Sequence, residues 1–288
     1  MRFAAALAAA CLLSALSLTA QRGSPDGLRL YVFDGGMLAS ADMSRYRLTA
    51  SEVATTNMSV TCFLVRHPRG TLMWDAGAVP DAAWTPTGRP ELQHLTLPEG
   101  QTREVTITSR LLPQLMAAGV TPAAVTHLAL SHYHWDHTAN ANAFAAATWL
   151  VRPVERDAMF APRPPELTQP STYASLRGSR VMTITTDDYD VFGDGTVVIK
   201  TAAGHTPGHQ VLFVRLPRTG PVVLSGDLYH YPEERTLARI PTFDADQAQT
   251  AAARQAIDAF LKRSGARLWI QHDFTGTATL RKAPEYYD

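Results

Sequence analysis

Short apolar runs alternate with turn residues along most of the chain and predict a mixed α/β protein. The runs over residues 29–36 and 59–77 are typical of strands, and a His-Pro-Arg-Gly turn at 67–70 divides the second run in two. Residues 108–119 instead repeat leucine and methionine at helical spacing, which predicts a helix packed on the core by these side chains and ended by a glycine. A short apolar run at 125–130 predicts a buried strand.

The second half of the chain has the same order of elements without a sequence repeat. Apolar runs over 196–205, 210–216 and 221–227 predict three strands, and 266–273 predicts a fourth. Residues 246–264 carry apolar side chains on one side and stop at a glycine, which predicts a helix. Several of these strands end in histidine or aspartate, so we expect strand ends to deliver polar side chains to a common site.

A cluster of titratable residues follows the strand predicted at 125–130. The segment 131–144, SHYHWDHTANANAF, places three histidines and one aspartate within six positions. In an extended or turning loop, His132 and His134 point to one side, while Asp136 and His137 reach a second point nearby. Imidazole and carboxylate are ligands for zinc and other divalent transition metals, so the cluster predicts metal binding.

Four ligands from one loop do not complete two coordination shells. The remaining donors are expected at other strand ends, and the segments 203–209, 225–227 and 271–273 supply histidines and an aspartate. The histidines at 67, 94 and 127 have no such context and are expected to be surface or core residues.

Composition narrows the class of protein. The chain has 288 residues, of which 45% are hydrophobic and 18% charged, and its 26 basic residues balance 26 acidic ones. No strong charge attracts nucleic acid or an anionic membrane, so neither is an expected partner.

The first residues read as an export signal. Arg2 precedes an apolar run over residues 4–18, which is too short to span a bilayer. We therefore expect a signal peptide at about 1–20 and one catalytic domain over 21–288, exported to the periplasm or secreted, with no membrane span. Removal of the signal leaves Cys62 as the only cysteine, which excludes an intramolecular disulfide and suits a small buried side chain.

The metal-binding pattern resembles a known family. The HxHxDH segment at 132–137, followed by a distal His, Asp and His and preceded by WDAG at 74–77, resembles the metallo-β-lactamase superfamily. The resemblance implies a four-layer αββα sandwich with a dinuclear site at one edge. It implies two divalent metal ions, zinc first, with cobalt, iron or manganese as alternatives. A hydroxide between the two metals would be the nucleophile.

The resemblance also assigns roles to individual residues. It implies that the first metal is held by three histidines (His132, His134, His205), the second by Asp136, His137 and His272, and that Asp227 bridges both. Asp75 and His209 would lie behind the ligands and orient them.

Within the superfamily, the sequence is most similar to the N-acyl homoserine lactonases. The bridging aspartate, with no cysteine near the site, argues against the β-lactamases proper. The supporting motifs lie at 29–36, 204–210, 226–235 and 280–288.

The lactonase resemblance implies catalytic roles, with one departure from the pattern. Asp136 would pass a proton to the leaving oxygen. Many such lactonases have a tyrosine three positions after the bridging aspartate, where this chain has His230, preceded by Tyr229. Either side chain could donate a hydrogen bond to the substrate carbonyl, or His230 could face solvent.

The sequence does not determine the substrate or the oligomeric state. The expected partner is a small lactone or ester, and an apolar groove for its acyl chain is expected among residues 37–48, 78–104 and 160–178, which include Met37, Trp84 and Phe160. An esterase or phosphotriesterase on the same scaffold is an alternative, as is a non-catalytic metal-binding or signal-binding protein. The oligomeric state is open, with a homodimer as one option.

Overall fold

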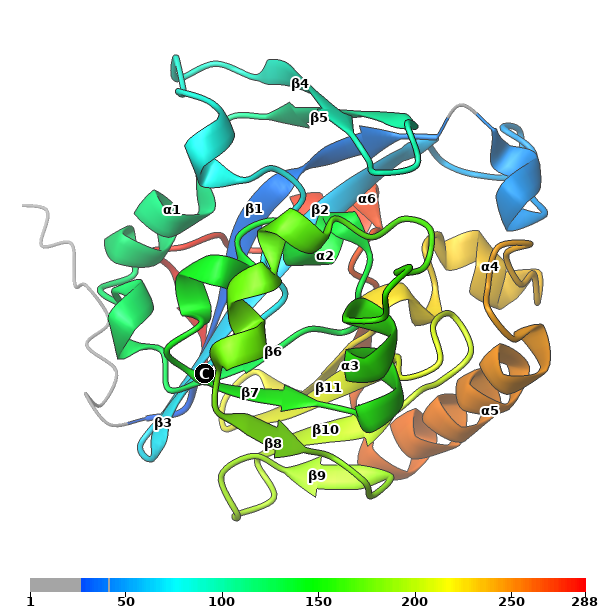
Figure 1. Ribbon diagram of the computed structural model, residues 1–288. Helices are drawn as coiled ribbons and strands as arrows, with labels where there is room; N and C mark the ends of the chain where they lie inside the picture. The colour runs from blue at the N-terminus through cyan, green and yellow to red at the C-terminus, as the bar shows by residue number, and fades with distance from the viewer. Residues whose placement is uncertain (1–26, 41) are drawn as a thin grey trace, which may run out of the picture.

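Two β-sheets packed face to face form the centre of the computed structural model, which describes residues 27–40 and 42–288 (Figure 1). The predicted signal peptide at 1–20 lies outside the described residues. None of the helices within the described ranges is long and apolar enough to cross a membrane.

The larger sheet has nine strands. Eight follow the order β4-β5-β1-β2-β3-β6-β7-β8, and β14 pairs with β1. The strands are β1 (Arg29–Ala39), β2 (Asn57–His67), β3 (Gly70–Trp74), β4 (Glu91–Thr96), β5 (Thr102–Ile107), β6 (His127–Ala129), β7 (Thr148–Val151), β8 (Val181–Thr183) and β14 (Tyr286–Tyr287). β1, β2 and β3 are antiparallel, with Tyr31 opposite Leu64, whereas β3, β6, β7 and β8 run parallel.

The smaller sheet has five strands in the order β13-β12-β11-β10-β9. They are β9 (Asp188–Asp190), β10 (Val197–Thr201), β11 (Gln210–Leu216), β12 (Gly220–Leu224) and β13 (Arg267–Trp269). β9 to β12 are antiparallel and β13 is parallel to β12. These strands confirm the predicted ones, but most end earlier, because the polar residues at their ends belong to loops.

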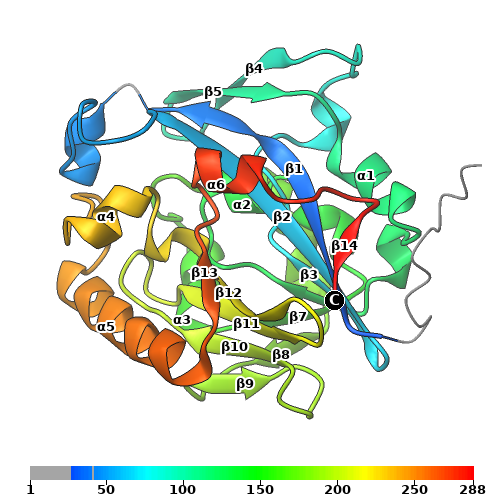
Figure 2. The same ribbon diagram turned by 180° about the vertical axis from the view of Figure 1, so that it is seen from behind.

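Helices cover the outer faces of both sheets (Figure 2). The α-helices are α1 (Leu111–Ala117), α2 (Trp135–Thr138), α3 (Pro153–Met159), α4 (Pro232–Thr236), α5 (Gln247–Ser264) and α6 (Phe274–Ala278). Short 3-10 helices are η1 (Met43–Tyr46), η2 (Asp81–Ala83), η3 (Pro122–Ala124), η4 (Ala141–Phe144), η5 (Pro170–Thr172), η6 (Ala174–Gly178) and η7 (Gly226–Leu228). The longest, α5, begins after Asp246, which accepts hydrogen bonds from two backbone N–H groups, and ends at Gly265 in the left-handed conformation.

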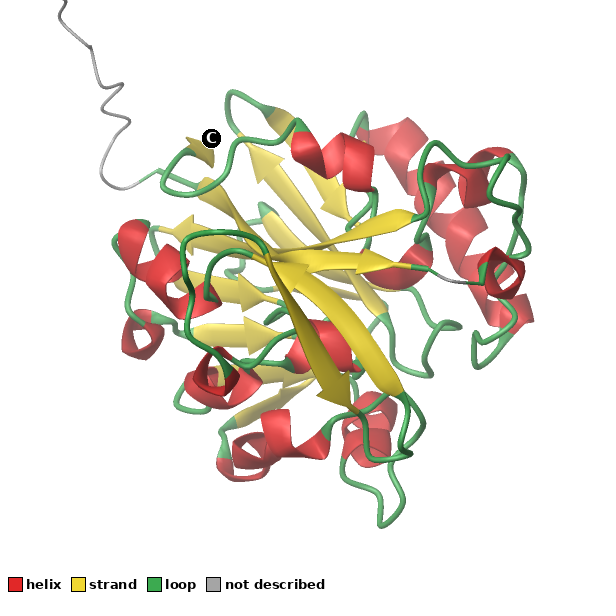
Figure 3. Ribbon diagram, turned by 90° about the horizontal axis from the view of Figure 1, so that it is seen from above, coloured by secondary structure: helices red, strands yellow, loops and turns green. Residues whose placement is uncertain are grey.

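The alternation of side chains along the strands creates the layers. Figure 3 shows the strands at the centre of the molecule with helices around them. In β1, Leu30 and Val32 enter the core between the two sheets, while Tyr31 and Phe33 face the helices on the other side. Burying one such side chain stabilises the fold by about 1.5–3 kcal/mol.

The smaller sheet uses the same alternation. Leu212 and Val214 of β11 join the core between the sheets, while Phe213 packs with Ile257 and Leu261 of α5. Helices, two sheets and helices are therefore stacked in order, and the predicted four-layer αββα sandwich is confirmed.

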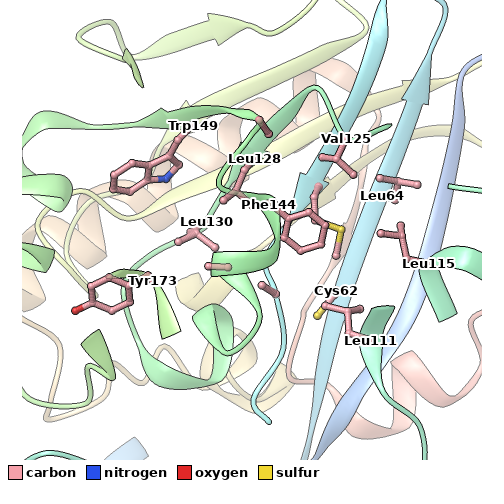
Figure 4. Close-up of a cluster of buried hydrophobic side chains, with 14 of the residues drawn as sticks. Cys62, Leu64, Leu111, Leu115, Val125, Leu128, Leu130, Phe144, Trp149 and Tyr173 are labelled. Carbon is pink, nitrogen blue, oxygen red and sulfur yellow. The ribbon is translucent and has the colours of Figure 1, made fainter. Parts of the chain in front are cut away.

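The core under the outer helices explains two residues singled out in the sequence (Figure 4). Cys62 is fully buried among apolar neighbours, as predicted. Leu111 and Leu115 of α1 are buried there too, but Met116, predicted to pack with them, is 54% exposed. That prediction is wrong because α1 has only seven residues and turns Met116 to its outer side.

Candidate metal centre

Strand ends carry the predicted metal ligands to one edge of the sandwich. The ligands follow four strands: His132, His134, Asp136 and His137 come after β6, His205 after β10, Asp227 after β12, and His272 after β13. Asp136 and His137 lie on the single turn of α2, whereas Asp227 lies on η7. All seven are buried. The structure therefore brings together every metal ligand that the sequence predicts.

The donor atoms form two groups. In one group, His132, His134, His205 and Asp227 each offer an atom, and these atoms lie within 4.8 Å of one another. In the other, Asp136, His137 and His272 do the same. The two groups match the sets expected for a first and a second metal.

Asp227 joins the two groups through its two carboxylate oxygens. Oδ1 lies 3.0 Å from Nε2 of His137 and 3.1 Å from Nε2 of His272. Oδ2 lies 3.3 Å from Nε2 of His205 and 3.5 Å from Nε2 of His132. Each oxygen thus faces one group, which is the arrangement that a bridging ligand requires.

The residues present fit metal ions. Nε2 of His132, Nε2 of His137 and Oδ1 of Asp227 are buried without a hydrogen-bond partner among the described residues. Nε2 of His137 nevertheless lies 3.0 Å from Oδ1 of Asp227, and Nε2 of His132 lies 3.5 Å from its Oδ2. Buried polar atoms without partners are costly, and a cation between them would remove that cost. Burial also lowers the pKa of His132 and of His134 well below the ordinary value, which keeps both imidazoles in the neutral form that binds metals.

Asp75 forms a hydrogen bond with His137 of the second donor group. Its Oδ2 accepts from Nδ1 of His137 at 2.9 Å and from Nε2 of Gln271 at 2.5 Å, and its Oδ1 accepts from the backbone N–H of Ser131. Its φ of 59° lies in the left-handed region, which aspartate tolerates better than most residues. Asp75 therefore orients His137, a predicted metal ligand, from the position expected from the sequence.

His209 supports Asp227 rather than offering a donor to either group. Its Nε2 accepts from the backbone N–H of Asp227 at 2.9 Å, and its Nδ1 donates to the carbonyl of Ala202 at 2.9 Å. The ring thus fixes the backbone that carries the bridging carboxylate.

Two carboxylates behind the site carry no sequence motif and were not predicted. Asp244 accepts from Nδ1 of His205 at 2.9 Å. Glu155, on α3, accepts from the backbone N–H of Tyr133 at 2.8 Å, from the hydroxyl of Thr206 and from the backbone N–H of Gly208 at 2.8 Å. Glu155 therefore ties the loop of His132 and His134 to the loop of His205.

The structure distinguishes between His230 and Tyr229, the two residues expected to donate a hydrogen bond to the substrate carbonyl. His230 is buried and lines the pocket, with Nε2 3.2 Å from Oδ2 of Asp227 and Nδ1 3.2 Å from Oε1 of Glu234. Burial alone lowers the pKa of His230, but the carboxylates of Glu234 and Asp227 outweigh burial and raise it to about 10.

Tyr229 turns the other way. Its ring lies in the apolar cluster under α5, with the guanidinium of Arg254 4.2 Å from its centroid, and it does not line the pocket. The structure therefore places His230, but not Tyr229, at the site.

A pocket of about 400 Å³ opens onto both donor groups. Parts of the segments 37–48, 78–104 and 160–178 line it, as expected, but Met37, Trp84 and Phe160 do not. Trp84 is buried in a core cluster and Phe160 packs on Trp149 and Tyr173, so both serve the core instead. The pocket wall consists of apolar, polar and charged residues: Leu38, Ala39, Ser40, Asp42, Arg45, Tyr46, Met58, Thr102, Arg103, Glu104, His134, Trp135, Asp136, Leu167, Asp227, His230, Phe243 and His272.

The remaining histidines have structural surroundings. His67 stacks on Phe192 at 4.3 Å between ring centroids and faces Asp194, and His94 is exposed on β4. His127 also packs on Phe192. None of the three lines the pocket, in agreement with the prediction.

Comparison with known proteins identifies the family. Residues 55–270 match the model of the metallo-beta-lactamase superfamily, and the chain belongs to that superfamily. This confirms the resemblance read from the motifs.

Individual relatives are similar over nearly their whole length. The N-acyl homoserine lactonase AttM of Azorhizobium caulinodans is 29% identical over 266 residues, covering 91% of this chain and 99% of the relative. AttM of Rhizobium radiobacter is 28% identical over 273 residues, covering 90% and 98%.

Solved structures share the fold. An N-acyl homoserine lactone hydrolase with the product N-hexanoyl-L-homoserine bound at its catalytic metal center superposes with a TM-score of 0.73 at 24% identity, covering 91% of this chain and 99% of that one. AidC, a dizinc quorum-quenching lactonase, superposes with a TM-score of 0.63 at 18% identity, covering 91% and 94%.

Proposed function

We propose that this protein is a metal-dependent hydrolase that opens the ring of N-acyl homoserine lactones. One observation carries the proposal: Asp227 faces one donor group with each carboxylate oxygen, at the floor of a pocket large enough for a small ligand. The similarity to curated lactonases along nearly the whole chain supports the choice of substrate.

The two donor groups would hold two divalent metal ions, zinc first. Metal ions bound there would lower the pKa of water toward neutrality and polarise an ester carbonyl. Three other residues hold the expected ligands in place through hydrogen bonds. Asp75 orients His137, Asp244 orients His205, and His209 fixes the backbone of Asp227.

The residues that face the pocket have separate tasks. In ester hydrolysis, water adds to the carbonyl carbon, and the bond from that carbon to the ring oxygen breaks. Asp136, which lines the pocket, takes the proton released by the water and returns it to the departing ring oxygen, so that a hydroxy acid is formed. His230 donates a hydrogen bond from Nε2 to the carbonyl oxygen as negative charge develops on it.

The test is acid release in a pH-stat. Metal-replete protein is given a long-chain N-acyl homoserine lactone, an aryl ester and a phosphotriester in turn, and the metal content of the same sample is measured. We expect catalytic acid release from the lactone with close to two metals per chain.

Matched histidine variants make this test specific. His272→Ala removes a donor of the second group, so it is expected to lower both metal content and lactone turnover. His94→Ala, which changes an exposed histidine outside the pocket, is expected to lower neither. Turnover of the aryl ester or phosphotriester alone would redirect the proposal to that substrate. Stoichiometric binding without turnover would replace it with a binding function.

A further inference from the structure

The pocket wall contains two arginines that the proposed chemistry does not use. Arg45 lies on η1 and Arg103 on β5, so they reach the pocket from two different segments. In Figure 1 the β4–β5 pair lies at the top and the blue segment that carries η1 lies at the upper right. A neutral acyl chain gains nothing from two cations beside it, so their presence requires another explanation.

The strand pattern turns Arg103 toward the interior. Side chains alternate along β5, and Arg103 shares its face with Val105 and Ile107, which are buried. On the neighbouring strand, Leu95 lies opposite Arg103 in the register and is also buried. Arg103 therefore lies on the core-facing side of β5, and it is the residue of this side that lines the pocket.

Arg45 is held over the ligand cluster by an aromatic ring. Its guanidinium lies 4.7 Å from the ring centroid of Phe243. That ring in turn packs on the rings of His205 and His230, with centroid separations of 5.8 and 5.4 Å. One aromatic ring thus separates Arg45 from a predicted metal ligand.

Neither guanidinium forms an ion pair with a carboxylate within the described parts of the chain. Arg103 donates only to the amide oxygen of Gln101, and Arg45 forms no ion pair there. Burial and then the like charge of Arg45 lower the pKa of Arg103, and the more distant carboxylates of Asp136 and Glu99 offset this shift only in part. The two cations therefore repel each other in a half-buried place. A bound anion would relieve this repulsion.

Two acidic residues at the pocket rim do not fill that role. Asp42 accepts from the backbone N–H and the hydroxyl of Ser44 and so caps η1. Glu104 points to the opposite face of β5 from Arg103, where it lies 3.5 Å from His94 and is largely exposed. The cationic pair therefore remains available to a ligand.

We propose that this site selects substrates whose non-reacting part ends in an anionic group, a carboxylate or a phosphate, which Arg45 and Arg103 bind while the ester lies at the metal ligands. The proposal rests on the proposed ester hydrolysis and narrows its substrate class. Arginine suits this task because its planar fork of N–H donors matches carboxylate and phosphate oxygens.

The experiment compares three homoserine lactones of matched acyl length: one ending in a methyl group, one in a carboxylate and one in a phosphate. The proteins are the metal-replete wild type, Arg45→Met, Arg103→Met, and Arg263→Met as a control at an exposed arginine near the end of α5. We expect kcat/KM of the wild type to be at least about tenfold higher for one anionic substrate than for the methyl-ended one. Arg45→Met and Arg103→Met should each reduce that ratio markedly at unchanged metal content, whereas Arg263→Met should preserve it.

Binding of the three ring-opened products, measured by calorimetry at low and high salt, separates this proposal from the proposed function. If no lactone is hydrolysed, the proposed function fails. All three products share the carboxylate formed by ring opening, so the comparison concerns the acyl end. Tighter binding of a product with an anionic acyl end than of the methyl-ended product, which weakens with salt and depends on Arg103, still supports the arginine site. Equal binding of all three products by the wild type, or an anion preference that survives in both pocket variants, overturns the proposal. The anion with the larger dependence on Arg103 identifies carboxylate or phosphate as the natural group.

Discussion

At the scale of single residues, His230 is the side chain whose role is easiest to separate from metal binding. It faces the pocket through Nε2 and is held from behind by Glu234. His230→Ala removes the proposed donor to the carbonyl oxygen, so we expect kcat on the lactone to fall about 10²–10³-fold, the usual loss for such a donor. Metal content measured on the same sample should stay unchanged. A proportional loss of metal would instead make His230 a part of the metal site.

Glu155 should matter for stability as well as for the ligands. An amide at this position would turn an NH₂ group toward N–H donors that now meet a carboxylate oxygen. We expect Glu155→Gln to lower the free energy of unfolding by about 1–3 kcal/mol and metal affinity by about 10–100-fold. Urea denaturation and metal titration measure the two effects, with Glu91→Gln at the edge strand β4 as the control. Unchanged metal affinity would limit Glu155 to a structural role.

The same residue gives a dependence on pH. Burial raises the pKa of Glu155 from the ordinary 4.5 to about 7, against the hydrogen bonds from Thr206, Gly208 and Tyr133. Because the folded pKa lies above the unfolded one, the stabilisation from this residue is complete below pH 4.5 and is lost as pH rises to about 7. The stability of the metal-free wild type minus that of Glu155→Gln should therefore fall by about 2 kcal/mol from pH 5 to 7. A constant or growing difference in urea denaturation would contradict this.

At the scale of elements, the loop of His205 depends on a glycine packed against the first turns of α5. Gly204 has a φ of 138°, and a Cβ there would lie 2.2 Å from the backbone nitrogen of Thr250. Gly204→Ala must therefore push the loop away from the helix and displace His205. We expect a loss of more than about 2 kcal/mol in unfolding free energy and weaker metal binding.

A second glycine provides the control for that variant. Gly220 has a φ of 82° and no neighbouring atom within 4 Å of an added Cβ. Gly220→Ala should cost only the backbone strain, about 1–2 kcal/mol, with metal affinity preserved. Equal effects of the two variants on metal affinity would show that the contact with α5 does not position His205.

The elements also show what the sequence could predict. Apolar runs located the long strands and α5, because hydrophobic periodicity is a local property of the chain. Choosing between Tyr229 and His230 was not possible, because η7 bends at Asp227 and decides which of two neighbours faces the pocket. The prediction that Met116 is buried was wrong, because α1 has only seven residues and exposes a position that the longer predicted helix was expected to bury.

At the scale of the whole molecule, metal removal tests how far the site supports the fold. The donors come from loops of both sheets, so bound metal stabilises only the folded state. At a metal concentration 1,000 times Kd each occupied site adds about 4.1 kcal/mol, which corresponds to about 8–16 °C in Tm. We expect a chelator to lower Tm of the wild type by at least the contribution of one site, and that of His272→Ala by less. An unchanged wild-type Tm would show that the sheets hold the site without help.

The candidate site was predictable in its ligands but not in its supports. His132, His134, Asp136 and His137 are adjacent in the chain, and the other donors stand at recognisable strand ends. Glu155, Asp244 and the arginine pair reach the site only through tertiary packing, since Glu155 contacts residues 22 to 53 positions away. Nothing local to these residues distinguishes them from ordinary surface charges.

Because of the position of His272, metal coordination at this centre reports on the docking of the two sheets. Its Nδ1 donates to the carbonyl of Ser59 at 2.7 Å, across 213 residues of sequence, and so links the edge of the smaller sheet to β2 of the larger one. The segment 132–137 supplies only part of the donors, and the complete donor set exists only when the two sheets have docked. A spectroscopic ion such as cobalt would therefore change its coordination at that moment, so its absorption would follow the docking of the two sheets during refolding.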